Sequence, residues 1–148
     1  MIVYLDSSAI VKRYVFEDGT DQVQEVYTKT LQGEAKLAFS VWNMSEALGV
    51  LDVYQRRKWL RKEDYRKGRE MLISETLRLI KLGLIKTIPV RTRLLIDSWA
   101  LIEKYHFYQA DALQIISAKH VNANQFMTGD KKLADIAKTE GINAQYLG

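Results

Sequence analysis

The sequence contains no cysteine, only two histidines and a single proline, and each shortage excludes a class of protein. Without cysteine the chain cannot form a disulfide scaffold, a thiolate zinc site, an iron–sulfur cluster or a cysteine nucleophile. His106 and His120 are too few for a three-histidine metal site and give little basis for Ser-His-Asp catalysis. Because Pro89 stands alone and no repeat or Gly/Ser-rich tract interrupts the chain, no linker is predicted.

Long apolar runs are missing as well. No stretch reaches the roughly 18 apolar residues that a membrane-spanning helix needs, and the opening MIVYLDSS lacks the pattern of a signal peptide. The 148 residues are 47% hydrophobic and 27% charged, the balance of an ordinary globular protein. We therefore expect one domain over residues 1–148, located in the cytoplasm and not bound to a membrane.

Three sequence motifs common in α/β enzymes are absent. The chain has no G-x-x-x-x-G-K-[ST] phosphate-binding loop, no pair of glycines separated by one residue, and no G-x-S-x-G nucleophile elbow. These absences exclude P-loop nucleotide hydrolysis, dinucleotide binding of the Rossmann type and the usual serine hydrolases.

The apolar pattern alternates short runs with longer helical periods, which predicts an α/β fold with a parallel sheet. Strands are expected at residues 2–5, 36–39, 85–90, 126–128 and 144–147. Pro89 makes the third of these an edge strand. Helices are expected at residues 8–14, 20–31, 41–59, 62–82, 93–105, 109–120 and 131–139, the first capped by Ser7-Ser8 and the third by Ser40.

The acidic residues are the remaining candidates for a catalytic or metal-binding site. Asp6 directly follows the first strand and Asp130 follows the fourth, so neighbouring strands would bring both to the edge of the sheet where ligands bind. Glu46 and Asp111 lie in apolar stretches, where an unpaired carboxylate is costly. Several oxygen ligands without His or Cys favour Mg²⁺ or Mn²⁺. The alternative is structural, since acids also cap helices, favour their first turns, or face solvent.

Four segments together resemble the PIN-domain ribonucleases, of the kind found as the VapC-like toxins of VapBC toxin–antitoxin pairs. They occur in the family's order and span nearly the whole chain. They read Val-Tyr-Leu-Asp-Ser-Ser-Ala at residues 3–9, Asn-Met-Ser-Glu-Ala at 43–47, Ala-Asp-Ala-Leu at 110–113 and Phe-Met-Thr-Gly-Asp-Lys-Lys-Leu at 126–133. Each segment is weak alone, and the combination is specific.

The resemblance implies a parallel sheet of order 3-2-1-4-5 and metal-assisted hydrolysis of RNA phosphodiesters. It implies that an acidic quartet surrounds one or two Mg²⁺ or Mn²⁺ ions, formed by Asp6, Glu46, Asp111 and Asp130. Ser8 and Thr128 match the family's supporting hydroxyls. Gly129 stands where Ser or Ala is common, which suggests a more flexible loop before Asp130. A homodimer and a cognate antitoxin are further expectations.

Residues 56–69 hold eight basic and two acidic side chains, more positive charge than the net +4 of the whole chain. This segment is either a solvated helical face, a track for the RNA backbone with Trp59 and Tyr65 available for stacking, or a contact surface for an acidic antitoxin. The candidate contact residues are Arg56, Arg57, Lys58, Arg61 and Lys62.

Other residues receive structural interpretations. Trp42, Trp99 and Tyr105 have helical spacing in apolar surroundings and are expected in the core, and Asp135 is expected on a solvated helix face.

Three other functions compete with a ribonuclease. A haloacid-dehalogenase-type phosphatase requires a second acid two residues after the first, where this chain has Ser8. A receiver-like signalling domain would carry its phosphorylated Asp on a later strand. A non-catalytic PIN protein that only binds RNA or assembles with partners is disfavoured by the four acids.

Overall fold

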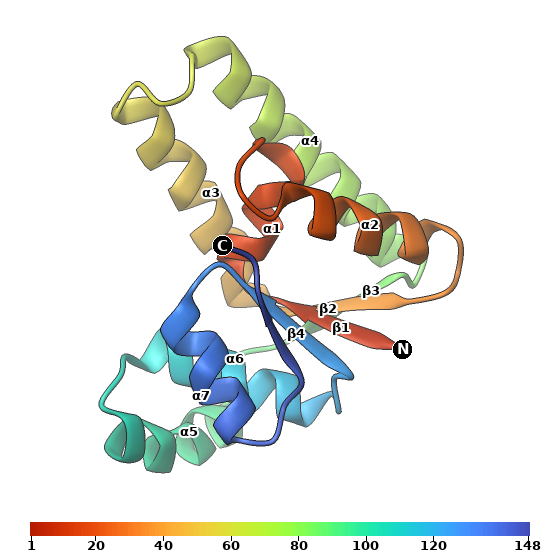
Figure 1. Ribbon diagram of the computed structural model, residues 1–148. Coiled ribbons are helices and arrows are strands. Elements are labelled where there is room, and N and C mark those ends of the chain that lie inside the picture. Colours follow the sequence, from red (N-terminus) through yellow and green to blue (C-terminus); the bar gives the residue numbers. More distant parts are fainter.

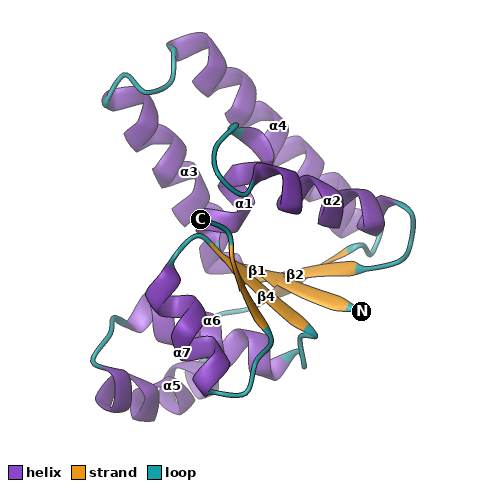
Figure 2. Ribbon diagram, in the orientation of Figure 1, coloured by secondary structure: helices purple, strands orange, loops and turns teal.

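The computed structural model describes all 148 residues as one parallel sheet between two layers of helices (Figures 1 and 2). The strands are β1 (Ile2–Leu5), β2 (Lys36–Ser40), β3 (Ile85–Ile88), β4 (Gln125–Thr128) and β5 (Ala144–Tyr146). Every pairing is parallel, and the spatial order is β3-β2-β1-β4-β5, as expected. β3, which precedes Pro89, forms an edge of the sheet.

The helices divide between the two faces of the sheet. In Figure 1, α1 to α4 cover one face and α5 to α7 the other. They are α1 (Ser7–Tyr14), α2 (Thr20–Leu31), α3 (Val41–Arg56), α4 (Lys62–Lys81), α5 (Thr92–Tyr105), α6 (Gln109–His120) and α7 (Lys131–Thr139). No helix combines the length and the apolar character that crossing a membrane requires.

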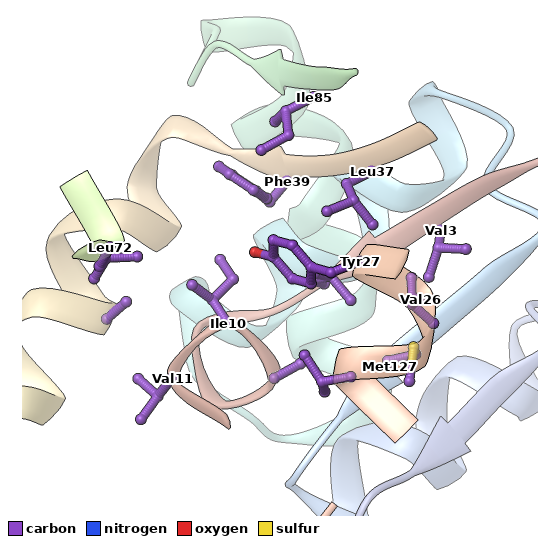
Figure 3. Close-up of a cluster of buried hydrophobic side chains, with 14 of the residues drawn as sticks. Val3, Ile10, Val11, Val26, Tyr27, Leu37, Phe39, Leu72, Ile85 and Met127 are labelled. Carbon is purple, nitrogen blue, oxygen red and sulfur yellow. The ribbon is translucent and has the colours of Figure 1, made fainter. Parts of the chain in front are cut away.

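The two layers arise from the alternation of side chains along each strand. Val3 and Leu5 of β1 belong to the cluster under α1 to α4, whereas Tyr4 between them belongs to the cluster under α5 to α7. All three are fully buried, which explains why these short strands read as continuous apolar runs. Figure 3 shows the first cluster, with Tyr27 of α2 among apolar side chains from the strands and helices around it.

Side-chain caps begin the helices that follow three of the strands. Asp6 accepts a hydrogen bond from the Ala9 backbone N–H, so Asp6 and not the Ser7-Ser8 pair caps α1. Ser40 caps α3, as predicted. Asp130 caps α7 by accepting from the Leu133 N–H at 3.1 Å. Capping of this kind places polar side chains at the carboxyl ends of β1, β2 and β4.

The prediction that Trp42 and Trp99 lie in the core is wrong. Trp42 is 48% exposed and Trp99 is 57% exposed. In α3 the buried side is formed by small or narrow residues at four-residue spacing, namely Asn43, Ala47 and Leu51, and Trp42 lies beside that stripe. Tyr105 does pack partly against the core.

Candidate active site

Asp6 lies at the carboxyl end of β1 with a carboxylate that is almost completely buried. Its Oδ1 accepts hydrogen bonds from Ser8 Oγ at 2.6 Å and from the Ala9 N–H at 2.9 Å. Its Oδ2 accepts from Thr128 Oγ1 on the neighbouring strand β4. Neutral donors therefore hold both oxygens of Asp6 in place.

The same hydroxyls fix the loop after β4. Thr128 Oγ1 accepts from the Asp130 N–H at 2.9 Å, and Ser8 Oγ accepts from the Gly129 N–H at 2.8 Å. Ser8 and Thr128 thus connect Asp6 to the segment that carries Asp130. The sequence resemblance predicts a supporting role in the site for these two hydroxyls, and that role stays a prediction.

Gly129 has a packing role, and the flexibility expected from the sequence stays a prediction. A Cβ at this position would lie 3.1 Å from Lys12 Cε and 3.3 Å from Ser8 Oγ. A larger residue would require these side chains to shift by a few tenths of an ångström. The glycine therefore permits the loop to approach α1 closely and leaves Ser8 in hydrogen-bonding position.

Glu46 lies half-buried on α3, one helical turn after Asn43. Asn43 Nδ2 donates to Glu46 Oε1 at 3.3 Å, while Asn43 Oδ1 accepts from the Ser40 N–H at 2.9 Å and from the Tyr4 hydroxyl at 3.2 Å. The Tyr4 hydroxyl also reaches Gln114 Oε1 on α6 at 2.6 Å. A buried polar network therefore connects Glu46 to strands β1 and β2 and to α6.

Asp111 lies in the first turn of α6, and its side chain borders a cavity of about 440 Å³ together with Asp130. The cavity is also lined by Lys132 on α7 and by the three residues that connect α5 to α6. Asp111 and Asp130 come from different helices, so the fold brings them to one hollow at the carboxyl end of β4.

The charges of neighbouring acids raise the pKa values of three of the four carboxyl groups. Burial raises the pKa of Asp6 above its ordinary value, and the charge of Asp130 adds to this effect. Burial also raises the pKa of Glu46, with further contributions from Asp6 and Asp111. The pKa of Asp111 is raised by burial and by Asp130 and is partly lowered by Lys132. The residues named from sequence therefore form one electrostatically coupled group, the acidic site (Asp6, Glu46, Asp111 and Asp130).

The chemistry of this group fits a hard divalent cation, although the ligands are not gathered around one point. None of the four acids forms an ion pair, and three have pKa values raised by burial and mutual repulsion. A divalent cation would relieve that repulsion. No three acidic or histidine side chains lie close enough together to hold an ion in this structure.

The basic segment lies elsewhere. Residues 56–69 cover the end of α3, the connecting turn and the start of α4, and Figure 1 shows this turn projecting away from the sheet. Its eight basic side chains are all exposed. Arg57 lies over the ring of Trp59 at 5.0 Å, and Trp59 is 63% exposed. We call residues 56–69 the basic turn; the fold does not bring it together with the acidic site.

Two residues that contact or flank the acidic site have no role that the sequence predicts. Asn43 positions Glu46 through its amide, and Lys132 lies close enough to Asp111 to lower its pKa. Both lie inside the segments that carry the family resemblance, at residues 43–47 and 126–133. Their position in these segments was the available signal, but only the fold shows what each side chain contacts.

Known proteins share this architecture. VapC20 from Mycobacterium tuberculosis, a sarcin–ricin-loop-cleaving toxin, superposes with a TM-score of 0.61 at 11% identity over 95% of each chain. VapBC2 from Rickettsia felis, determined bound to a DNA fragment from their promoter, gives 0.62 at 14% identity over the whole of both chains. FitAcB from Neisseria gonorrhoeae gives 0.64 at 18% identity over 97% of this chain and 96% of that one.

At these identities the structural likeness shows the fold alone. Curated protein sequences give no match. The sequence itself matches the family model for the PIN domain over residues 3–139, which includes all four acids and both supporting hydroxyls. The match covers nearly the whole chain, and the sheet order agrees with it. The chain therefore belongs to the PIN domain family.

Proposed function

We propose that this protein is a Mg²⁺- or Mn²⁺-dependent endoribonuclease that hydrolyses RNA phosphodiester bonds. The observation that carries the proposal is the acidic site, where four carboxylates from different elements lie close enough for their charges to raise the pKa values of three of them, and none forms an ion pair. Retaining such a group lowers the stability of the folded chain, because ionised carboxylates repel and lose solvation. Binding a cation that acts on phosphate accounts for their presence.

Asp6, Glu46, Asp111 and Asp130 would hold the metal. When bound, a divalent cation activates water for attack and neutralises the charge that develops on the phosphate. The protein itself contributes by holding these carboxylates in position. Asp6 cannot rotate away, because the Ser8 and Thr128 hydroxyls and the Ala9 N–H hold its two oxygens.

Asp130 and Glu46 are positioned in a similar way. The Asp130 backbone is fixed by Thr128 and its side chain by the N-terminus of α7. Glu46 is oriented by Asn43, which the buried Tyr4 hydroxyl holds in turn. The backbone of these two segments is therefore positioned in advance, whereas the carboxylate side chains must move to meet one cation, because no three of them lie close enough in this structure.

We further propose that the protein is a toxin that an antitoxin protein holds inactive, that it forms a homodimer, and that it acts in the cytoplasm, where RNA is accessible. Similarity in fold to VapC20, a sarcin–ricin-loop-cleaving toxin, and to VapBC2 supports this proposal. The basic turn would then contact the RNA backbone, since its exposed guanidinium and ammonium groups match phosphate chemistry.

The direct test is incubation of the purified protein with RNA in Mn²⁺ or Mg²⁺, followed by sequencing of the 5′ ends of the fragments. We expect metal-dependent cleavage at defined positions that is absent with EDTA and in Asp6→Asn. Cleavage that continues in EDTA, or that Asp6→Asn retains at the wild-type rate, would exclude the proposed chemistry.

A second candidate is a PIN protein that binds RNA without cleaving it. The observation that favours it is the separation of the acids, of which no three meet closely enough to hold a cation in this structure. Calorimetric titration of the protein with Mn²⁺ separates the two functions. Binding that Asp111→Asn abolishes supports the nuclease, and no binding supports the non-catalytic protein.

A further inference from the structure

The cavity beside the acidic site is lined by aromatic side chains as well as by carboxylates. Its volume is about 440 Å³, enough for a nucleobase. Its lining includes Asp111 and Asp130 of the acidic site together with the loop between α5 and α6, His106 to Tyr108. Two consecutive aromatic side chains, Phe107 and Tyr108, are therefore placed beside acids that we assign to phosphate chemistry.

The two rings differ in how they are held. Phe107 packs edge-on against Tyr105, with ring centroids 5.9 Å apart, and belongs to the partly buried margin of the core under α5 to α7. Tyr108 is 84% exposed, although its backbone is fixed as the N-cap residue of α6. Tyr108 therefore offers a free aromatic face three residues before Asp111.

The backbone that carries these rings is well defined. His106 ends α5 in the left-handed conformation, with φ of 57°, and its N–H donates to the Ile102 carbonyl at 2.8 Å. The Asp111 N–H donates back to the Tyr108 carbonyl at 3.1 Å. The position of the Tyr108 backbone is thus coupled to that of Asp111.

One positively charged side chain also lines the cavity. Lys132 lines it from α7 and is exposed, and it is close enough to Asp111 to lower the pKa of that carboxyl. No acid forms an ion pair with Lys132. Its ammonium is available to a phosphate oxygen next to the acidic site.

We propose that this cavity is a nucleotide subsite, in which one base of a single-stranded RNA stacks on Tyr108 and the adjoining phosphate contacts Lys132. The inference deepens the proposed function and rests on it, since the acidic site determines which phosphate lies beside the cavity. Every nucleobase has a face that can stack, so the subsite accepts any of the four bases. It fixes the distance between one base and the cleaved bond.

The experiment measures binding of a short fluorescein-labelled single-stranded RNA by fluorescence anisotropy, at low salt and in EDTA so that metal-dependent cleavage is prevented. Removal of one stacking ring weakens binding by roughly 5- to 150-fold, and we expect an effect in this range for Tyr108→Ala. Tyr108→Phe should bind as the wild type, because the ring remains. Trp99→Ala is the matched control, since Trp99 is a 57% exposed aromatic residue of α5 that does not line the cavity.

The same RNA with every base removed then tests the stacking. Loss of the bases should weaken binding to the wild type more than binding to Tyr108→Ala, because the two changes remove the same interaction. Equal binding by Tyr108→Ala and the wild type, or an abasic effect of the same size in the variant, would overturn the subsite. If the wild type binds RNA through Tyr108 but never cleaves it, the nuclease proposal fails and the subsite stands.

Discussion

The acidic site and the basic turn carry opposite charges, and the structure holds Asp6 of the acidic site differently from the basic side chains. Asp6 is buried, and each of its oxygens accepts hydrogen bonds from fixed donors. The basic side chains are exposed, and the ion pairs among them, such as Arg56 with Asp52 and Arg61 with Asp64, are local pairs on the helix surface. Surface pairs of this kind contribute little to stability.

This difference indicates what each region can do. A group whose charge is buried and oriented can act at one atom of a ligand, because its position does not change when the ligand arrives. Exposed, flexible cations act on charge in general, and salt screens them. The acidic site is therefore suited to catalysis at one atom of a ligand, and the basic turn is suited to attracting a polyanion. Four predictions test this division.

The largest effect is expected at the acidic site. Asp6→Asn and Asp111→Asn should each lower the rate of RNA cleavage by on the order of 100-fold or more, because each removes a charge that would bind the cation. Circular dichroism should show the fold intact, and Asp135→Asn, which changes an exposed acid on α7, should cleave as the wild type. A wild-type rate in either site variant would contradict the assignment.

The next effect concerns the hydroxyl that joins β1 to β4. Thr128→Val keeps the shape but removes the donor to Asp6 and the acceptor for the Asp130 N–H. Removal of such a supporting hydrogen bond typically lowers activity by about 10- to 100-fold, and the unpaired N–H should lower the free energy of unfolding by roughly 1–3 kcal/mol. Cleavage rates and urea denaturation measure the two effects.

Thr139→Val provides the control for Thr128→Val. Thr139 is an exposed residue of α7 that donates only to the Asp135 carbonyl. Its replacement should change neither the cleavage rate nor the stability appreciably. If both valine variants behave alike, the Thr128 hydroxyl has no special role in positioning Asp6.

A smaller, salt-dependent effect is expected at the basic turn. Replacing Arg56, Arg57 and Lys58 together by alanine should weaken RNA binding and reduce the slope of log affinity against log salt by about 0.7 for each phosphate that the protein ceases to neutralise. The charge-matched control replaces Lys36, Lys81 and Lys86, which are exposed near the amino ends of β2 and β3. An unchanged slope in the first variant would assign the basic turn to a protein partner.

The smallest effect is on thermal stability. Because the pKa values of Asp6, Glu46 and Asp111 are raised in the folded protein, the folded state binds more protons than the unfolded chain as these groups titrate. Without metal, stability should therefore fall as pH rises from the ordinary carboxyl range through the raised pKa values. Asp111→Asn should raise the Tm by a few degrees at neutral pH and less at acidic pH.

Differential scanning calorimetry over this pH range checks the sign. Mn²⁺ should raise the Tm of the wild type more than that of Asp111→Asn, because a ligand stabilises only the form that binds it. A wild-type Tm that increases with pH through the titration of these groups would show that the carboxylates do not destabilise the metal-free fold.

Much of the fold could be predicted because the local signals agree. The helices at Thr20–Leu31 and Gln109–His120 begin and end where the pattern placed them. The predicted cap of α1 is wrong, since two serines and the preceding Asp6 are all good caps and only the strand end decides between them. The prediction for Trp42 is wrong because spacing alone cannot show on which side of a buried stripe a residue lies.

The sequence likewise indicates which four acids are candidates for the site, but it does not show which groups each of them contacts. From the sequence, Asp6 and Asp130 are either helix caps or members of a functional site. In the structure both side chains cap helices and also belong to the acidic site. The cap supplies the hydrogen bond that orients each carboxylate. Asn43 was missed because its contacts are with residues remote in sequence.

The sequence by itself determined what chemistry was possible. Its lack of cysteine, its two histidines and its acids after predicted strands limited the protein to carboxylate chemistry. The tertiary structure alone decided how those groups meet, because the pairing of β1 with β4 brings Thr128 to Asp6 across 122 positions of the chain. Contacts of that kind depend on strand order and burial, which no local pattern encodes.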